Sequence, residues 1–281
     1  MLSIISVNYK TSDYLSRMLE TLHQHTQGCD FEVFVVENAS GDDLSLLETK
    51  YPKVKFIYND QNLGFACACN RAIKQAQGDY FVLVNPDIIF VEDALSKIEQ
   101  QMNQDREVGV GGISLKNLDS TQQACVWRFP RPLDQLLLLL KIPHLIKNVG
   151  PVDQWLMKDF DYSRSAEVDQ VMGAFFCIRR EVIEQIGPLD EGFFMWYEEV
   201  DFCRRAKNAG WKVRYYADIS ARHKKGSSFD RVATLKKQAM IRCSLRRYMR
   251  KHHGFWAWLL FTLPEPIYVI IALISSIVKP K

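Results

Sequence analysis

The stretch YFVLVNPDIIF, residues 80–90, places a carboxylate among apolar side chains. Asp87 follows an apolar run that ends at Val84, and the apolar run resumes at Ile88. A buried carboxylate is costly unless it is paired or bound to a metal. The pattern therefore favours a binding or pairing role for Asp87 over a simple strand end.

A second acidic group lies in FFMWYEEVDFCRR, residues 193–205. Glu198, Glu199 and Asp201 fall within four residues and follow Trp196 and Tyr197. Clustered acids beside aromatic rings raise one another's pKa, which suits a general base. The alternative is a solvated helix N-terminus, where acids interact favourably with the helix dipole.

One histidine and seven cysteines are the other candidate metal ligands. His223 stands in ISARHKKGSS, after a predicted strand and before the flexible sequence Gly226-Ser227-Ser228. A lone histidine is more often structural, and a metal-binding role for His223 is favoured only if a metal at Asp87 needs a nitrogen ligand. The cysteines form no CxxC pair, and their odd number without a secretion signal predicts reduced, cytosolic thiols. We interpret Cys67 and Cys69 as packed helix residues, because no second Cys/His pair accompanies them as a metal site would require.

Strands and helices alternate through the first hundred residues. The apolar runs predict strands at 2–7, 31–36, 54–58 and 80–84, and the periodicity predicts helices from 12 or 13 to about 25, from 42 or 43 through 47, at 64–77 and at 92–104. This alternation predicts an α/β fold with a right-handed, mostly parallel sheet. Ligands of such sheets bind at the carboxyl ends of the strands.

Polar residues follow each of the four predicted strands. They are Asn8-Tyr9, Glu37-Asn38, Asn59-Asp60 and Asn85-Pro86-Asp87. Asn and Asp also favour turns, so any one of them alone is a weak signal. Because four polar strand ends in a row would converge on one crevice, we interpret them together as a binding site.

The second half is less regular. We expect strands at 109–115, 168–179 and 213–216, an apolar helical segment at 135–142, a loop-rich insertion at 143–166, and helices at 180–186 and 198–208. The leucine-rich segment at 135–142 is too short to span a bilayer.

Positive charge is concentrated near the end of the chain. Residues 222–251 contain eleven Lys or Arg and one acid, a net charge of +10 in a chain of net charge +3. Residues 231–250 predict a basic amphipathic helix, and the apolar stretch 255–278 is interrupted by Pro264-Glu265-Pro266. We expect a tail that lies on anionic lipid, or a helical hairpin packed on the domain or on a second subunit.

Two other classes fit poorly. Nucleic-acid binding through the basic segment is disfavoured, because aromatic residues are not interleaved with the basic ones and an apolar tail follows. An NAD-dependent oxidoreductase is disfavoured, because the first strand leads into SVNYKTSD rather than GxGxxG.

The ordered set of motifs resembles family 2 glycosyltransferases with the GT-A fold, especially the bacterial rhamnosyltransferase-like branch. The matching pieces are SVNYK (6–10), VVENASGD (35–42), NLGFACACNRAI (62–73), VLVNPD (82–87), VMGAFFCIRREVIEQIGPLDEGFF (171–194), WYEEVDFCRRAKNAGW (196–211) and the His223 loop. Each piece is weak alone, but the order is specific over roughly residues 3–230. The resemblance implies a GT-A domain at 1–230 and a membrane-associating helical tail at 231–281.

The resemblance also implies site residues. Asp87 matches the metal-binding carboxylate of a DxD-like motif, with Asn85 in place of the first acid, and His223 matches a metal- or phosphate-contacting histidine. Glu199 matches the catalytic base, with Asp201 as the fallback. The positions that match the donor pocket are Asn8, Glu37 (usually Asp in the family), Asn62, Gly64 and Asn70. The literal DxD at Asp159-Phe160-Asp161 follows no apolar strand, so we assign it no metal role.

The implied reaction is an inverting transfer from a nucleoside-diphosphate sugar with Mg²⁺ or Mn²⁺ as cofactor. The best match for the donor is dTDP-L-rhamnose, with a UDP-hexose as the alternative. The implied acceptor is a lipid-linked saccharide at the cytoplasmic face of the plasma membrane, in bacterial cell-surface polysaccharide synthesis. A catalytically inactive binding protein on the same fold is the other alternative. Trp196 and Tyr197 are expected either to stack on sugars or to belong to the core.

Overall fold

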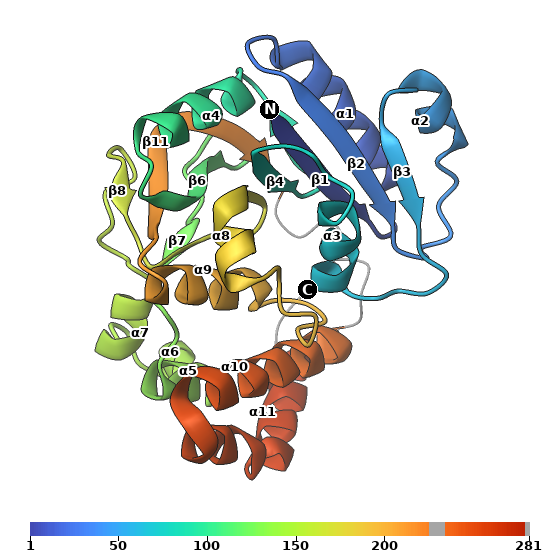
Figure 1. Ribbon diagram of the computed structural model, residues 1–281. Helices are drawn as coiled ribbons and strands as arrows, with labels where there is room; N and C mark the ends of the chain where they lie inside the picture. Colours follow the sequence, from blue (N-terminus) through green and yellow to red (C-terminus); the bar gives the residue numbers. More distant parts are fainter. Residues whose placement is uncertain (225–233, 279–281) are drawn as a thin grey trace.

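A twisted mixed sheet forms the centre of the computed structural model, which describes residues 1–224 and 234–278 (Figure 1). Within those residues the sheet has nine strands. Their order is β3 (Lys55–Tyr58), β2 (Phe31–Glu37), β1 (Leu2–Asn8), β4 (Tyr80–Val84), β10 (Phe175–Arg179), β6 (Val108–Lys116), β11 (Lys212–His223) and β5 (Ile88–Phe90), with β8 (Ala166–Glu167) beside β11. Only β10, β5 and β8 run against the other six described strands, which confirms the predicted mostly parallel α/β sheet.

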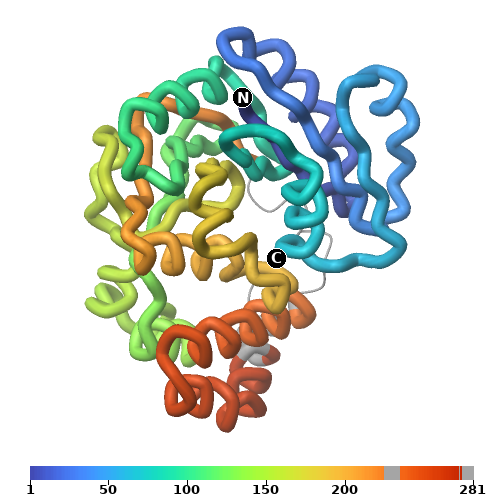
Figure 2. Tube along the Cα trace, in the orientation of Figure 1, coloured from blue at the N-terminus to red at the C-terminus, as the bar shows by residue number. Residues whose placement is uncertain are grey.

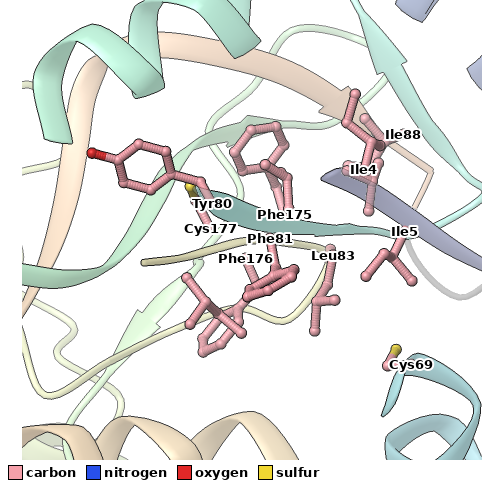
Figure 3. Packing of buried hydrophobic residues seen from close by; sticks show 14 of the residues in the cluster. Ile4, Ile5, Cys69, Tyr80, Phe81, Leu83, Ile88, Phe175, Phe176 and Cys177 are labelled. Carbon is pink, nitrogen blue, oxygen red and sulfur yellow. The ribbon is translucent and has the colours of Figure 1, made fainter. Parts of the chain in front are cut away.

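Continuous apolar runs explain the central strands. All residues of β1 and β4 are buried, and the two strands pair in parallel from Leu2 with Tyr80 to Ile5 with Leu83. Figure 3 shows Phe81, Phe175 and their neighbours packed around β4. Strands buried on both faces need such runs, because helices cover both sides of a parallel sheet.

Amphipathic helices cover the sheet as the periodicity predicted. They are α1 (Ser12–His25), α2 (Ser45–Lys50), α3 (Phe65–Ile73), α4 (Ala94–Gln104) and α8 (Arg180–Ile186). Helix α1 buries Leu15, Met18, Leu19 and Leu22, the predicted apolar face. Helix α3 ends at Ile73, four residues before the predicted end.

Three sequence predictions for the second half were wrong in detail. The expected strand at 168–179 is two strands. The first, β9 (Gln170–Val171), pairs with β7 (Val126–Trp127) in a separate small sheet, and the second, β10, belongs to the main sheet. The segment 143–166 holds α7 (Gly150–Trp155) and the end of α6 (Ile142–Leu145), so it is more than a loop. Strand β11 is also longer than 213–216 and reaches His223.

A group of helices lies at one end of the molecule (Figures 1 and 2). We call α5 (Pro132–Leu139), α6, α10 (Thr234–Thr262) and α11 (Glu265–Val278) the helical layer. It is joined to α9 (Glu198–Asn208) through a second apolar cluster that contains Val200, Leu245 and Phe261. Helix α10 turns at Gly254, whose φ of +86° suits glycine.

The tail folds as a helical hairpin packed on the domain, one of the arrangements expected from the sequence, and its contact with lipid stays a prediction. Glu265, the charge in the apolar stretch, pairs with Arg242 and Arg246, so the start of α11 folds against α10. No single helix among the described residues is long and apolar enough to cross a membrane. Only the bent pair of Leu235–Thr262 and Glu265–Ile271, at 63°, reaches that length and hydropathy together. The predicted boundary at 230/231 and the loop at 226–228 lie outside the described residues.

Candidate active site

The carboxyl ends of β1 and β2 are tied together by side chains. Asn8 is fully buried and donates hydrogen bonds to the carboxylates of Glu37 and Asp42, the latter at 3.0 Å. The other oxygen of Glu37 accepts from the Ser40 backbone N–H at 2.6 Å. Parallel pairing sets Asn8 directly opposite Glu37. Two predicted donor-pocket residues thus meet at one edge of the sheet, where they shape the loop that begins at residue 38.

A network of amides continues this edge toward α3. Asn38 donates to Asn62 Oδ1 at 3.0 Å and accepts from the Asn59 amide at 2.8 Å. Asn62 Oδ1 also accepts from the Gly64 backbone N–H at 2.9 Å. The turn that leads into α3 is therefore held by the side chains of Asn38 and Asn59 from two strand ends and of Asn62 from the turn itself. Asn38 organises this turn, although the sequence singled it out only as a strand-end residue.

Gly64 and Asn70 contact the segment that leads to the acid pair. At Gly64, φ is +81° and a Cβ would lie 2.4 Å from the carbonyl oxygen of Phe194, which also accepts a hydrogen bond from Phe65 N–H at 2.8 Å. Asn70 is fully buried, and its amide bonds the backbone of Leu189 at 2.8 and 3.2 Å. These contacts explain both residue types without a ligand. Their predicted contacts with the donor stay predictions.

The structure brings Asp87 and His223 together. Strand β11 pairs antiparallel with β5, so that His223 lies opposite Ile88, and Lys224 N–H donates to the Asp87 carbonyl at 3.1 Å. Both side chains are buried, and His223 Nε2 lies 3.3 Å from Asp87 Oδ1. The backbone of neighbouring Asn85 donates to the Ala174 carbonyl at 2.9 Å, which fixes the turn to β10.

The hydrogen bonds of His223 reveal what its pair with Asp87 requires. Gln123 Nε2 donates to Asn117 Oδ1 at 2.8 Å, so Gln123 Oε1 is the acceptor that faces His223 Nδ1 at 2.7 Å. Nδ1 therefore donates its hydrogen to Gln123, which leaves Nε2 as the ring nitrogen that faces the carboxylate oxygen of Asp87. A cation or a proton between Nε2 and this oxygen would stabilise the pair. Imidazole nitrogen and carboxylate oxygen are both ligands for a divalent cation such as Mn²⁺.

A pocket of about 310 Å³ opens beside Asp87. Its lining includes three cationic side chains, Arg17, Arg222 and Lys224. Lys224 Nζ donates to the hydroxyl of Tyr14 at 2.6 Å, which holds that cation at the pocket wall. Positive charge around a concave surface suits an anionic ligand. Across the described residues, no group of three or more His, Cys, Asp and Glu side chains is arranged to hold a metal, so Asp87 and His223 would supply two protein ligands.

The acid pair stands at the N-terminus of α9. Trp196 and Tyr197 before it both have left-handed backbone conformations, with φ of 63° and 70°. Such conformations cost about 1 kcal/mol or more each in non-glycine residues and are retained where packing fixes them. Tyr197 packs on the second apolar cluster and donates to Gln135 Oε1 at 3.0 Å, so it belongs to the core. The strained entry sets the direction in which Glu198 and Glu199 point.

The two carboxyl groups are buried without full hydrogen bonding. Oε2 of Glu198 and Oε2 of Glu199 are shielded from solvent and have no hydrogen-bond partner. Burial raises the pKa of Glu198 well above its usual value, and the charge of Glu199 raises it further. Burial also raises the pKa of Glu199, against backbone N–H groups at the start of α9 that lower it. We therefore assign the proton of the pair to Glu198 and the charge to Glu199.

Asp201, the fallback base, has a different environment. Its side chain is fully buried and lies 2.8 Å from Arg205 Nε, 2.8 Å from Lys251 Nζ and 2.7 Å from His252 Nε2. Burial alone would raise its pKa, but hydrogen bonds from His252, Lys251 and Arg205 outweigh burial and lower it. Its carboxylate bonds Arg205 within α9 and joins α9 to α10 through Lys251 and His252. The structure thus removes Asp201 as a base and makes it a link between two helices.

The acid pair and the Asp87 turn meet through one short segment. Gly173 faces the Glu199 side chain, where a Cβ would lie 3.5 Å from Glu199 Cγ. The next residue, Ala174, accepts the hydrogen bond from Asn85. The carboxyl end of β4 and the start of α9 therefore border the same edge of the sheet.

Sequence comparison identifies the class of protein that this fold and site define. The family model described as glycosyl transferase family 2 matches residues 3–187, and the model described as glycosyl transferase family group 2 matches residues 148–280. The first match covers well over half of the chain. The chain therefore belongs to glycosyl transferase family 2, and it is a glycosyltransferase.

Individual relatives confirm the resemblance to the rhamnosyltransferase-like branch. The chain is 22% identical to the N-acetylglucosaminyl-diphospho-decaprenol L-rhamnosyltransferase of Mycobacterium tuberculosis over 268 residues, which cover 91% of this chain and 86% of that protein. It is 24% identical to the rhamnosyltransferase WbbL of Escherichia coli, over 79% of this chain and 83% of that protein.

A solved structure confirms the GT-A fold. The mannosyltransferase PcManGT of Pyrobaculum calidifontis, in complex with GDP-Man and Mn²⁺, aligns with a TM-score of 0.59 and 15% identity. The alignment covers 100% of this chain and 76% of that protein.

Proposed function

We propose that this protein is a metal-dependent, inverting rhamnosyltransferase that uses dTDP-L-rhamnose and a lipid-linked saccharide acceptor. The observation that carries the proposal is the meeting of Asp87 and His223 at the sheet edge that the Glu199 carboxylate also borders. A glycosyltransferase needs a cation site for an anionic leaving group and a base for the attacking hydroxyl, and these residues supply both kinds of group.

On the donor side, the residues would bind a nucleoside diphosphate. Asn8 and Glu37 lie at the carboxyl ends of β1 and β2, where the nucleoside would bind. The side-chain amide of Asn85 would donate a hydrogen bond to the nucleotide sugar. Asp87 and His223 would hold Mg²⁺ or Mn²⁺, which when bound neutralises charge on the diphosphate leaving group. Arg17 and Arg222 line the adjacent pocket and add positive charge where the phosphates would enter.

On the acceptor side, Glu199 would act as the general base. Its unpartnered Oε2 would accept the proton of the acceptor hydroxyl while that oxygen bonds to the anomeric carbon and the bond to the diphosphate breaks. A single displacement of this kind inverts the anomeric configuration. Glu198 would stay protonated and keep a second negative charge away from the nucleophile.

The tail and the relatives support the proposed lipid-linked acceptor and the proposed membrane location. The relative from M. tuberculosis is named for a sugar linked to decaprenol through a diphosphate, an acceptor that resides in a membrane. We propose the same class of acceptor here, in cell-surface polysaccharide synthesis. The helical layer, which exposes Trp256 and Leu263, would bring the site to the cytoplasmic face of the plasma membrane.

A panel of nucleotide sugars tests this proposal. We would measure the thermal shift and donor hydrolysis with dTDP-rhamnose, UDP-hexoses and GDP-mannose, each with Mg²⁺, Mn²⁺ or EDTA. The variants are Asp87→Ala and, as a matched control, Asp161→Ala, because Asp161 belongs to the literal DxD and its side chain is 57% exposed. We expect a metal-dependent shift with dTDP-rhamnose that Asp87→Ala abolishes and Asp161→Ala retains.

The outcomes separate the parts of the proposal. A metal-dependent shift with a UDP-hexose alone would replace the donor and keep the mechanism. A shift that Asp161→Ala abolishes would move the cation site to the insertion. Donor binding without transfer to any lipid-linked acceptor would favour the inactive binding protein.

A further inference from the structure

Exposed apolar side chains are concentrated on the helical layer. Of the seventeen large apolar side chains that are strongly exposed in the described part of the chain, eleven lie on the helical layer or at the end of α6. On α10 and α11 they are Leu235, Phe255, Trp256, Leu260, Leu263, Ile267, Ile270 and Leu273. Large exposed apolar patches on soluble proteins mark interaction surfaces.

The leucine-rich segment α5–α6 contributes the other three. Leu136 and Leu139 of α5 face inward against the second apolar cluster. Leu133 is 57% exposed, and Leu145 and Ile146 at the end of α6 are 79% and 59% exposed. Helix α5 contacts both α6 and α10, so α5 stands beside the tail although it lies about a hundred residues earlier in the sequence (Figure 1). No function was predicted for this segment from its residues.

Charge distinguishes the candidate partners of this surface. Residues 131–150 contain one acid, Asp134, which is buried, and residues 234–278 contain one acid, Glu265, which pairs with two arginines. Arg131 just before α5, Lys147 just after α6 and Arg250 on α10 are exposed. The described face of these four helices therefore presents apolar side chains and cations without a free carboxylate.

The structure assigns α5–α6 as a second membrane-contacting arm, which binds an anionic lipid surface together with α10 and α11. This inference rests on the membrane location in the proposed function and extends it to a segment outside the tail. A second copy of the chain is a poorer partner for this surface, because a two-fold interface would place the cationic face of one copy against the same cationic face of the other. Anionic head groups complement them, at about 1 kcal/mol for each cation near the surface.

Much of the basic segment is already paired within the protein. Arg247 and Lys251 bond Asp190 at 2.7 Å each, in addition to the pairs at Glu265 and Asp201. These cations attach α10 to the domain and have less charge to offer a membrane. The apolar residues of both arms would therefore carry most of the binding, with anionic lipid adding to it.

Vesicle flotation of the full-length protein tests the inference. The vesicles are phosphatidylcholine, with and without phosphatidylglycerol. The α6 variant is Leu145→Glu with Ile146→Glu, the tail variant is Trp256→Glu with Leu263→Glu, and the control is Leu46→Glu on α2, where Leu46 is 82% exposed. We expect at least a tenfold loss of binding to anionic vesicles for the α6 variant, because two apolar contacts are replaced by carboxylates. The control should bind as the wild type does.

The outcomes distinguish this inference from the proposed function. If the tail variant loses binding and the α6 variant binds normally, the second arm is wrong while the membrane location stands. If the wild type binds no vesicle but shows the donor-dependent thermal shift, both membrane statements fail and the glycosyltransferase chemistry survives. If light scattering finds a lipid-free dimer that the α6 variant converts to a monomer with unchanged flotation, the surface binds a second copy. Thermal midpoints of all variants check that each protein is folded.

Discussion

The two faces of the first turn of α9 hold carboxylates in opposite environments. Glu198 and Glu199 are buried with unpartnered oxygens, and burial raises the pKa of both. Asp201, two residues further along from Glu199, is fully buried, but hydrogen bonds from His252, Lys251 and Arg205 lower its pKa. The difference follows from what packs against each face: the Gly173 segment on one, and α10 on the other.

This contrast separates a carboxyl group that can take part in proton transfer from one that only links two helices. A buried carboxylate with free bonding capacity and a raised pKa can take a proton from a substrate, whereas one saturated by cations is a poor base. The sequence places all three acids in one cluster. Three-dimensional packing divides the cluster into a pair with unpartnered oxygens, in which we propose the base, and a structural link, and each side of that division can be tested.

The largest expected effect is on the base. Glu199→Gln keeps the shape of the side chain and removes its ability to accept a proton, so we expect kcat to fall by about 10³-fold. The wild-type rate should decrease on the acidic side through a pKa above 4.5, because burial raises the pKa of Glu199 and protonation inactivates the base. Steady-state kinetics across pH measure both. A variant that retains more than a tenth of the activity would end the assignment of Glu199 as the base.

The next effect is on stability. Asp201→Asn removes a fully buried carboxylate and leaves Arg205 and Lys251 without their counter-ion, so we expect about 3 kcal/mol less stability at neutral pH. Because the folded pKa of Asp201 is lowered, its carboxylate stabilises the protein above the unfolded pKa, and this contribution is lost as pH falls through the folded value. Denaturant titrations of the wild type and the variant should therefore show a difference in the free energy of unfolding that becomes smaller below about pH 4. Asp161→Asn is the exposed control, with no measurable change expected.

The smallest effect sharpens the division within the pair. Glu198→Gln replaces a carboxyl group that we expect to be protonated by a neutral group of similar shape, so kcat should change by less than about tenfold. The measurement is the same kinetic assay used for Glu199. A loss as large as that of Glu199→Gln, with an unchanged thermal midpoint, would instead assign the charge and the proton transfer to Glu198.

The sequence predicted which candidate site residues lie close together wherever the order of strands and helices alone determines their proximity. Asp87 follows β4, and parallel strands with crossover helices bring their carboxyl ends to one edge, so Asn8, Glu37 and Asn85 could be placed together from their order. The meeting of His223 with Asp87 was expected only from the family resemblance. It depends on β11 pairing with β5, a three-residue strand formed by the apolar run 88–90, and the sequence does not specify that pairing.

The rest depended on contacts between distant segments. Arg205, four residues after Asp201, offers a local ion-pair signal, but the contacts of Asp201 with Lys251 and His252, about fifty residues away, could not be predicted from the sequence. The continuous strand expected at 168–179 is interrupted because Gly173 turns against Glu199 instead of continuing the ladder. The exposure of Leu145 likewise depends on where α5 packs, which periodicity does not specify.

The contact between Gly64 and Phe194 limits how this enzyme can be recombined with its relatives. The backbone entering α3 and the backbone leading to α9 are in direct contact, with a hydrogen bond from Phe65 to Phe194 and no room for a Cβ at residue 64. The segment that enters α3 and the segment that enters α9 are therefore not independent modules. A chimera divided between them must keep glycine at 64 and the backbone course of 193–197 together, whichever parent supplies the sugar specificity.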